Sequence, residues 1–402
     1  MGQSTFPVPS TGSSTSTVLP VNASSVILDG SLTSASTYTT TVNGNGGIAY
    51  LTATDNPATI TIGGNNYTVA ANSVSTTKTV VGSSASVTIA NGAFAQTAPS
   101  TFTASTMPTS DSWDAVAYGN GTFVAVQQSA NTDGAYSTNG TTWTSSTMSS
   151  SVIWLAVTFG NGYFIAVAYG PTTVGSYSTN GTTWTAMTMP SSQSWSGVAY
   201  GNGYYVAIAR STTTGAYSTN GTSWTASTMP SSSNWYGVTY GNGYFVAVAF
   251  NTTAGAYSSN GTTWTASTLT SSSAWEAVAY GNGTFVAVQA SGTTAGSYST
   301  NGTSWTASTM PSGGSTAGWQ SVTYGNGYFV AVAYNTTAGA YSTNGTTWTA
   351  STMPSSSNWL GVTYGNGYFV AVASGTTAGA YFAQPAALPV NFGIYNGPTT
   401  IN

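Results

Sequence analysis

Residues 319–354 read WQSVTYGNGYFVAVAYNTTAGAYSTNGTTWTASTMP, and close copies of this stretch recur from about residue 98 onward. A first tryptophan opens each copy, at intervals of 40 to 44 residues: Trp113, Trp154, Trp195, Trp235, Trp275, Trp319 and Trp359. A second tryptophan lies near the end of six copies: Trp143, Trp184, Trp224, Trp264, Trp305 and Trp348. These positions account for all 13 tryptophans. Their strict recurrence predicts core positions of a repeat fold whose units pack on their neighbours.

Each copy contains four short β-strand signals. In the first copy they lie at residues 113–118, 123–126, 134–137 and around Trp143. The turns Gly119-Asn120-Gly121 and Asn139-Gly140 separate them, and Asn-Gly between apolar runs is a strong hairpin signal because both residues tolerate positive φ. Four antiparallel strands in about 40 residues are the signature of a β-propeller blade. The sequence therefore predicts an all-β fold, a β-propeller of four-stranded blades.

The chain ends predict how the ring closes. Seven first tryptophans indicate seven blades, but the last copy stops at Gly379-Ala380-Tyr381-Phe382 without its fourth strand. The missing piece lies upstream, where residues 100–108 read STFTASTMP with Phe102 in the tryptophan position. We predict that this N-terminal strand completes the last blade, which would also remove exposed sheet edges that invite aggregation.

Charged residues are scarce, and this limits the available chemistry. The 402 residues include 2 Lys+Arg and 6 Asp+Glu, with no His and no Cys; Lys78, Arg210 and Glu276 are each the only residue of their type. Imidazole bases, thiol nucleophiles and thiolate metal sites are thereby excluded. We expect that the chain is not an enzyme and has no cofactor. The net charge of −4 predicts no nucleic-acid partner and no membrane insertion or binding to anionic membranes.

The composition divides the chain into four parts. Residues 1–24 form a Ser/Thr-rich arm, residues 25–97 a small β domain for anchoring or oligomerisation, residues 98–382 the seven-bladed propeller, and residues 383–402 a C-terminal tail. No heptad pattern specifies an oligomer, although a homo-oligomer such as a trimer is common for fibre proteins.

The start of the chain carries no export signal. Residues 1–7 lack a basic region followed by an apolar one, and no later stretch is long and apolar enough to span a membrane. A surface of hydroxyls and amides is nevertheless suited to an extracellular setting. A virus particle that assembles inside the cell and is released by lysis would reconcile the two observations, which predicts a virion location.

The repeats differ mainly at two positions on one predicted face. After the first tryptophan they carry Asp114, Leu155, Ser196, Tyr236, Glu276, Gln320 and Leu360. At the end of the second strand they carry Gln128, Tyr169, Arg210, Phe250, Ala290, Tyr334 and Ser374. Aromatic rings beside amides and carboxylates suit glycans, so this face is a candidate ligand site. Unselected variation would give the same pattern, and both interpretations stay open on sequence alone.

Two other patterns in the sequence do not indicate a functional site. Asp111, Asp114 and Asp133 lie in the first copy without the spacing of a calcium loop, so we predict no metal site. Triplets such as Asn139-Gly140-Thr141 match glycosylation sequons, but we predict that they serve as hairpin turns.

The turn S-T-N-G-T-T-W resembles the Asp-box of sialidase-type propellers, S-x-D-x-G-x-T-W. Six copies carry it, from residues 137–143 to residues 342–348, with Asn in place of Asp and one residue fewer. Asp-boxes are structural turns in that family, so the resemblance implies the fold. Sialidases proper need an arginine triad and a Tyr/Glu pair, which one arginine and one glutamate cannot supply.

The tandem repeat over roughly residues 100–382 is also similar to repeats in structural proteins of tailed bacteriophages, especially marine ones. This resemblance implies a phage fibre, spike or head-decoration subunit. Residues 1–97 would contact other virion proteins, and the propeller would bind host surface glycans. The alternative is a cellular surface adhesin or surface-layer protein.

Overall fold

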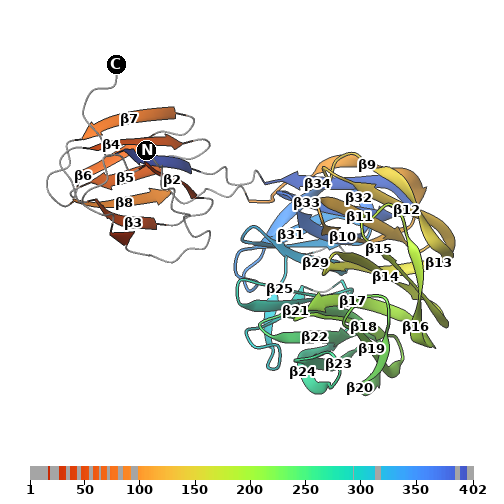
Figure 1. The fold of residues 1–402 in the computed structure, drawn as a ribbon. Helices are drawn as coiled ribbons and strands as arrows, with labels where there is room; N and C mark the ends of the chain where they lie inside the picture. Colours follow the sequence, from red (N-terminus) through yellow and green to blue (C-terminus); the bar gives the residue numbers. More distant parts are fainter. Residues whose placement is uncertain are drawn as a thin grey trace. The chain divides into compact units, whose positions relative to one another are not determined.

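The computed structural model describes residues 98–292, 294–312 and 318–384 in full, and the backbone of nine strands in the flanking segments. The chain forms two units (Figure 1): a larger one, Thr97–Gln384, and a smaller one made of Met1–Gln96 and Pro385–Asn402. Strands and turns make up the described part of the chain, and no helix in that part could span a membrane.

The smaller unit contains two sheets. Its strands are β1 (Thr17–Val18), β2 (Ile27–Leu32), β3 (Thr37–Val42), β4 (Gly47–Ala53), β5 (Ala58–Ile62), β6 (Asn65–Val69), β7 (Ser73–Thr79), β8 (Ala85–Asn91) and β35 (Val390–Tyr395). The sheet orders are β1-β3-β8-β5-β6 and β2-β35-β4-β7. Strand β35 follows the repeats in sequence, yet it pairs antiparallel with both β2 and β4. The sequence analysis did not foresee this return of the chain.

The larger unit repeats four antiparallel strands. The first strands are β10 (Trp113–Gly119), β17 (Trp195–Gly201), β21 (Trp235–Gly241), β25 (Trp275–Gly281), β29 (Trp319–Gly325) and the second halves of β13 (Thr144–Gly160) and β32 (Thr349–Gly365). The second strands are β11 (Thr122–Gln127), β14 (Tyr163–Tyr169), β18 (Tyr204–Ala209), β22 (Tyr244–Ala249), β26 (Thr284–Gln289), β30 (Tyr328–Ala333) and β33 (Tyr368–Ser374).

The remaining strands complete each sheet. The third strands are β12 (Asn131–Ser137), β15 (Thr172–Ser178), β19 (Thr212–Ser218), β23 (Thr252–Ser258), β27 (Ala295–Ser299), β31 (Thr336–Ser342) and β34 (Thr376–Ala383). The fourth strands are β9 (Thr103–Asp111), β16 (Thr185–Gln193), β20 (Thr225–Ser233), β24 (Thr265–Ser273), β28 (Thr306–Thr309) and the first halves of β13 and β32. Strands β13 and β32 each run from one repeat into the next, and so join two repeats into a seven-stranded sheet.

The first strands form a closed ring. Contacts run from β10 through β13, β17, β21, β25, β29 and β32, and β32 contacts β10 again. Strand β9 pairs antiparallel with β34, with Thr103 opposite Tyr381. The predicted pairing of the N-terminal strand with the last repeat is therefore confirmed, as is the prediction of an all-β fold of repeated four-stranded sheets.

The core lies between neighbouring repeats. The second strands are buried on both faces, and Phe123, Val124 and Ala125 in β11 have no exposed surface. All seven first tryptophans are also fully buried, as predicted. The second tryptophans agree only in part: Trp143, Trp184 and Trp264 are buried, whereas Trp224, Trp305 and Trp348 are half-buried. A glycine ends each first strand, and a Cβ on Gly119 would lie 1.9 Å from the Phe159 ring of the next repeat. These glycines allow an aromatic ring to pack directly on the neighbouring backbone.

The Asn-Gly turns have the geometry that the sequence predicted. Asn120 and Gly121 both have positive φ, 48° and 78°, as a tight hairpin requires. In the second turn type, Asn139 Oδ1 accepts hydrogen bonds from the backbone N–H groups of Thr141 and Thr142, at 2.9 Å each. The same bonds recur in the other repeats that carry this turn. These asparagines therefore hold turns.

Candidate functional site

A pocket of about 740 Å³ opens at the centre of the ring and is lined by residues from every repeat. All of the candidate residues predicted from the variation between repeats lie in its wall: Asp114, Leu155, Ser196, Tyr236, Glu276, Gln320, Leu360, Gln128, Tyr169, Arg210, Phe250 and Tyr334. Ala290 and Ser374, which occupy the second of the two variable positions in their repeats, line it as well. The fold thus gathers positions about 40 residues apart in sequence into one site.

A β-bulge positions the residue after each first tryptophan. The register between the first and second strands shifts at this residue in every repeat, for example between Trp113 and Ala115. A bulge leaves one residue unpaired and re-aims its side chain. The flanking tryptophan is buried in the core, while Asp114 and its equivalents line the pocket.

A backbone hydrogen bond holds the second variable position close to this bulge. The N–H of Arg210 donates to the carbonyl of Ser194 at 2.9 Å, and the N–H of Phe250 donates to that of Asn234 at 2.8 Å. Gln128, Ala290 and Tyr334 make the equivalent bond. Both variable positions of a repeat therefore stand at the same end of the first two strands.

Arg210 lies between two aromatic rings. Its guanidinium carbon is 3.8 Å from the centre of the Tyr236 ring and 5.0 Å from that of Tyr169. Tyr236 in turn stacks on Phe250, with ring centres 4.8 Å apart and an angle of 21° between the planes. We call Tyr169, Arg210, Tyr236 and Phe250 the aromatic clamp; its members come from three consecutive repeats. The Nε atom of Arg210 is buried and has no hydrogen-bond partner among the described residues.

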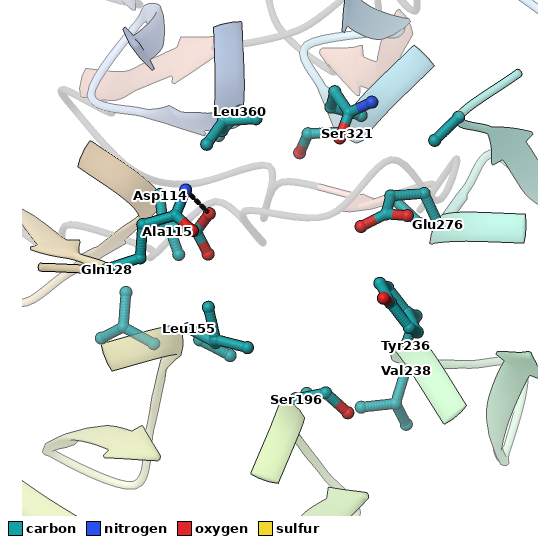
Figure 2. A pocket seen from close by; sticks show the side chains of 18 of the residues that line it. Asp114, Ala115, Gln128, Leu155, Ser196, Tyr236, Val238, Glu276, Ser321 and Leu360 are labelled. Atoms are coloured by element: carbon teal, nitrogen blue, oxygen red, sulfur yellow. Dashed lines mark hydrogen bonds between the residues drawn. The ribbon is translucent and has the colours of Figure 1, made fainter. Parts of the chain in front are cut away.

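Two carboxyl groups in the pocket have unusual proton affinity. Burial raises the pKa of Asp114 from 3.8 to about 7, although the Arg210 charge opposes the shift. Gln128 Nε2 donates a hydrogen bond to Asp114 Oδ1 at 3.2 Å, and Leu155 and Leu360 lie on the same side of the pocket (Figure 2). Burial raises the pKa of Glu276 to about 8, with Arg210 opposing and Asp114 adding to the rise.

These pKa values set the charge of the pocket. Below about pH 7 both carboxyls are largely protonated, and the Arg210 guanidinium leaves the site positive. Above about pH 8 both are ionised and the site becomes negative. Glu276 and Tyr236 lie across the pocket from Asp114 (Figure 2), so the two acids face the cavity from different sides.

Not every candidate residue is free to meet a ligand. The Ser196 hydroxyl is buried and lies 2.7 Å from the carbonyl oxygen of Trp235, to which it donates. Its hydroxyl therefore joins two repeats. Tyr334 is 41% exposed and occupies the same repeat position as Tyr169, but the repeat after it carries no arginine.

A second layer of the pocket was missed by the sequence analysis. Seven valines, one from each repeat, also line it: Val116, Val157, Val198, Val238, Val278, Val322 and Val362. They are the constant V of the W-x-x-V motif, two residues beyond the variable position. Differences between repeats reveal only the variable positions, and these valines are the same in every repeat.

Among the described residues outside the pocket, Asp111 belongs to a hydrogen-bonded group. Asp111 accepts bonds from Thr109 Oγ1 at 3.0 Å and from Asn131 Nδ2 at 3.2 Å. In the described part of the chain, no three His, Cys, Asp or Glu side chains are grouped as metal ligands.

Comparison with known proteins identifies the fold. No family model matches the chain, and neither does any curated protein. Among solved structures, a streptogramin B lyase matches with a TM-score of 0.62 and 13% identity, over 70% of this chain and 97% of the other. Virginiamycin B lyase from Staphylococcus aureus matches with a TM-score of 0.62 and 11% identity, over 70% of this chain and 98% of the other. YCF48 bound to D1 peptide matches with a TM-score of 0.56 and 16% identity, over 71% of this chain and 95% of the other.

These similar structures are β-propeller proteins, and the larger unit of this chain is a β-propeller. At such low identity the likeness concerns the fold alone.

The same comparison corrects one prediction. We expected that the chain is not an enzyme, but the matching lyases are enzymes built on this fold. The absence of His and Cys excludes imidazole and thiol chemistry only. Acid–base catalysis needs groups that exchange protons near neutral pH, and burial gives Asp114 and Glu276 that property. The prediction was wrong because it rested on the missing imidazole and thiol groups and the scarcity of charge, and left out the carboxyl groups that remain.

Proposed function

We propose that the larger unit is a seven-bladed β-propeller that binds a saccharide in its central pocket. The blade count is supported by the seven first strands that contact one another in a ring. It is also supported by a shared packing contact: a Cβ on Gly365, in the last repeat, would meet the Tyr118 ring of the first at 2.0 Å, as equivalent glycines meet their next neighbours. The Asn turns agree with a shortened Asp-box.

The observation that carries the binding proposal is the convergence of the variable positions. Repeats that are otherwise closely similar differ mainly at two positions, and both positions line one pocket in every repeat. Unselected variation has no reason to concentrate in the wall of a cavity. Convergent polar groups in a large, partly apolar cavity are typical of ligand sites.

The lining favours a saccharide. Tyr169 and Phe250 line the pocket and offer ring surface on which the C–H faces of sugars pack. Gln128 and Gln320 offer amides that both donate and accept hydrogen bonds. Sugar hydroxyls need both kinds of partner within the same site.

We propose further that the chain is a virion component, a fibre, spike or head-decoration subunit that recognises host surface glycans. The resemblance of residues 100–382 to phage structural repeats supports this. The smaller unit would contact other virion proteins and, in an oligomer such as a trimer, further copies of itself. A cellular surface adhesin is the alternative location for the same binding activity.

A second candidate function is catalysis on the bound ligand. The specific observation in its favour is the pair Asp114 and Glu276, which hold protons near neutral pH on different sides of the pocket. Such a pair can supply one proton donor and one proton acceptor at the same pH. Release of product from a bound oligosaccharide, lost in Asp114→Asn and Glu276→Gln, would establish this function.

The binding proposal is tested with a glycan array and two tryptophan variants of the intact chain. Ala290→Trp places a ring in the pocket at the repeat position where Phe250 and Tyr334 already carry one, so we expect it to fold and to block binding. Thr138→Trp alters an exposed turn residue after β12 and serves as the control. Glycan binding that survives Ala290→Trp would contradict the proposal.

The location is tested on source material by mass spectrometry across a density gradient. We expect this chain to sediment with DNA-containing particles at a fixed ratio to the major capsid protein. Recovery with cell envelopes would exclude the virion and establish the adhesin.

A further inference from the structure

We propose that Arg210 anchors an oxyanion of the ligand, a carboxylate or a sulfate, so that the pocket selects an acidic saccharide over a neutral one. This inference rests on the proposed saccharide binding and specifies its chemical class. It is carried by the aromatic clamp, by the unsatisfied buried nitrogen within it, and by the composition of the pocket wall.

The clamp holds the guanidinium at the pocket. Its carbon lies over the Tyr236 ring, 3.8 Å from the ring centre, and over the Tyr169 ring, 5.0 Å from the ring centre, and Arg210 lines the pocket. Phe250 stacks behind Tyr236 and fixes that ring. A planar fork of donors held in one orientation is suited to bidentate recognition of a carboxylate or a similar oxyanion.

The Nε atom of Arg210 lacks a partner. It is buried, and the described residues offer it no acceptor. A buried polar group without a hydrogen bond is costly, and for a charged group the cost is larger. Arg210 is also the only arginine of the chain and lines the pocket. An oxyanion of a ligand that binds the guanidinium group of Arg210 would compensate this cost.

The neighbouring acids leave the Arg210 charge uncompensated below about pH 7. The charged and titratable groups whose fields act around it are Asp114, Glu276, Tyr236 and Tyr169, and burial keeps the first two protonated up to about pH 7 and about pH 8. Protonated carboxyls can also donate hydrogen bonds to an anion. Ionised carboxyls would instead repel it, so we expect tighter binding at pH 6 than at pH 9.

The first experiment measures the binding of three sugars to the intact chain at pH 6 by calorimetry or saturation-transfer NMR: glucose, glucuronate and glucose 6-sulfate. We expect at least one of the two anionic sugars to bind about tenfold more tightly than glucose, the effect of one charge-assisted hydrogen-bonded pair. The two anionic arms distinguish a carboxylate ligand from a sulfate ligand. In Arg210→Gln the preference for the anion disappears, and in Arg210→Lys, which lacks the planar fork, most of it is lost.

A matched pair of variants tests the clamp itself. Tyr169 and Tyr334 occupy the same repeat position and are 39% and 41% exposed, but only Tyr169 packs on Arg210. Tyr169→Leu is expected to weaken binding of the anionic sugar several-fold relative to glucose. Tyr334→Leu removes an equally exposed ring and is expected to leave the preference unchanged. An equal effect of the two variants would contradict the role assigned to the clamp.

The outcomes separate this inference from the function on which it rests. Equal affinity for glucose and both anionic sugars, unchanged by Arg210→Gln, would overturn the inference and leave saccharide binding standing. If no sugar binds, acetate and inorganic sulfate are titrated: binding that depends on Arg210 would support the anion site and overturn saccharide binding. No binding of any of these anions would overturn the anion site.

Discussion

Side chains of ordinary type acquire their properties from where the bulges place them. Asp114 and Glu276 stand at the same repeat position as Leu155 and Leu360, in a wall whose second layer is valine. Such surroundings disfavour a charge, and this raises the pKa of both carboxyls. The site thus depends on burial as much as on residue type.

This burial predicts a pH dependence of stability. The folded state binds the proton of Asp114 more tightly than the unfolded chain, where its pKa is 3.8. Its contribution to stability is therefore complete below about pH 4 and is lost as the pH rises to about 7; for Glu276 the loss extends to about pH 8. We expect the Tm from calorimetry to fall between pH 5 and pH 9, and Asp114→Asn to reduce that fall and raise the Tm at pH 9.

Gln320→Leu is the control for this prediction. It changes the same repeat position without removing a titratable group, so the fall in Tm should match that of the wild type. A fall that is unaffected by both Asp114→Asn and Glu276→Gln would show that the two carboxyls are not the source.

The repeats made most of the element structure predictable. Asn-Gly turns and apolar runs fixed the strands, and STFTASTMP identified β9 as the partner of β34 because it copies a fragment that the last repeat lacks. The candidate residues were found because repeats can be compared with one another. Strand β35 could not be found this way, since its pairing with β2 and β4 has no repeated counterpart.

The aromatic clamp and the bulges could not be predicted from the sequence either, because both depend on how strands and sheets are placed against each other. Tyr169, Arg210 and Tyr236 come from three repeats, and their stacking depends on how neighbouring sheets are set against each other. The bulge after each tryptophan depends on the register of two strands, which the pattern of residues does not specify. The pKa of Asp114 depends both on the bulge that places its side chain and on how the neighbouring sheets surround it.

At the scale of elements, the glycine that ends each first strand sets the approach of neighbouring sheets. A Cβ on Gly241 would lie 2.0 Å from the Tyr280 ring of the next repeat, whereas a Cβ on Gly243 in the following turn would meet nothing within 4 Å. We expect Gly241→Ala to lower the free energy of unfolding by about 3 kcal/mol or more through overpacking. Gly243→Ala, at φ +82°, carries only a backbone penalty of about 1–2 kcal/mol. Chemical denaturation measures the free energy of unfolding of both variants. A larger loss in Gly243→Ala than in Gly241→Ala would contradict this packing.

At the scale of the whole molecule, closure of the ring depends on the N-terminal strand. Phe102 precedes β9, is 3% exposed, and packs with Trp359 and Phe369 of the last repeat. Its backbone N–H donates to the carbonyl of Thr352 at 2.9 Å, so this segment joins the last repeat to its neighbour. This strand and its anchor residue therefore join the ends of the ring, in addition to the contact of β32 with β10.

Phe102 therefore offers a test of closure. Phe102→Ala is expected to lower the free energy of unfolding by about 3–5 kcal/mol, the usual cost of removing a buried aromatic ring. Phe102→Trp, which restores the residue found at this position in the other repeats, is expected to be far better tolerated. Thermal unfolding of the two variants measures both, and equal damage by Ala and Trp would show that the position does not share the environment of its repeats.

The most direct test of the central claim, that the variable positions of the repeats form a ligand site, is a crystal structure of the intact protein at pH 6, saturated with whichever of glucuronate and glucose 6-sulfate binds more tightly. We expect the sugar in the central pocket, with its carboxylate or sulfate at the N–H groups of Arg210 and its ring against the aromatic clamp. A sugar bound only at the Asn-Gly turns, or a pocket that stays empty at saturation, would contradict it.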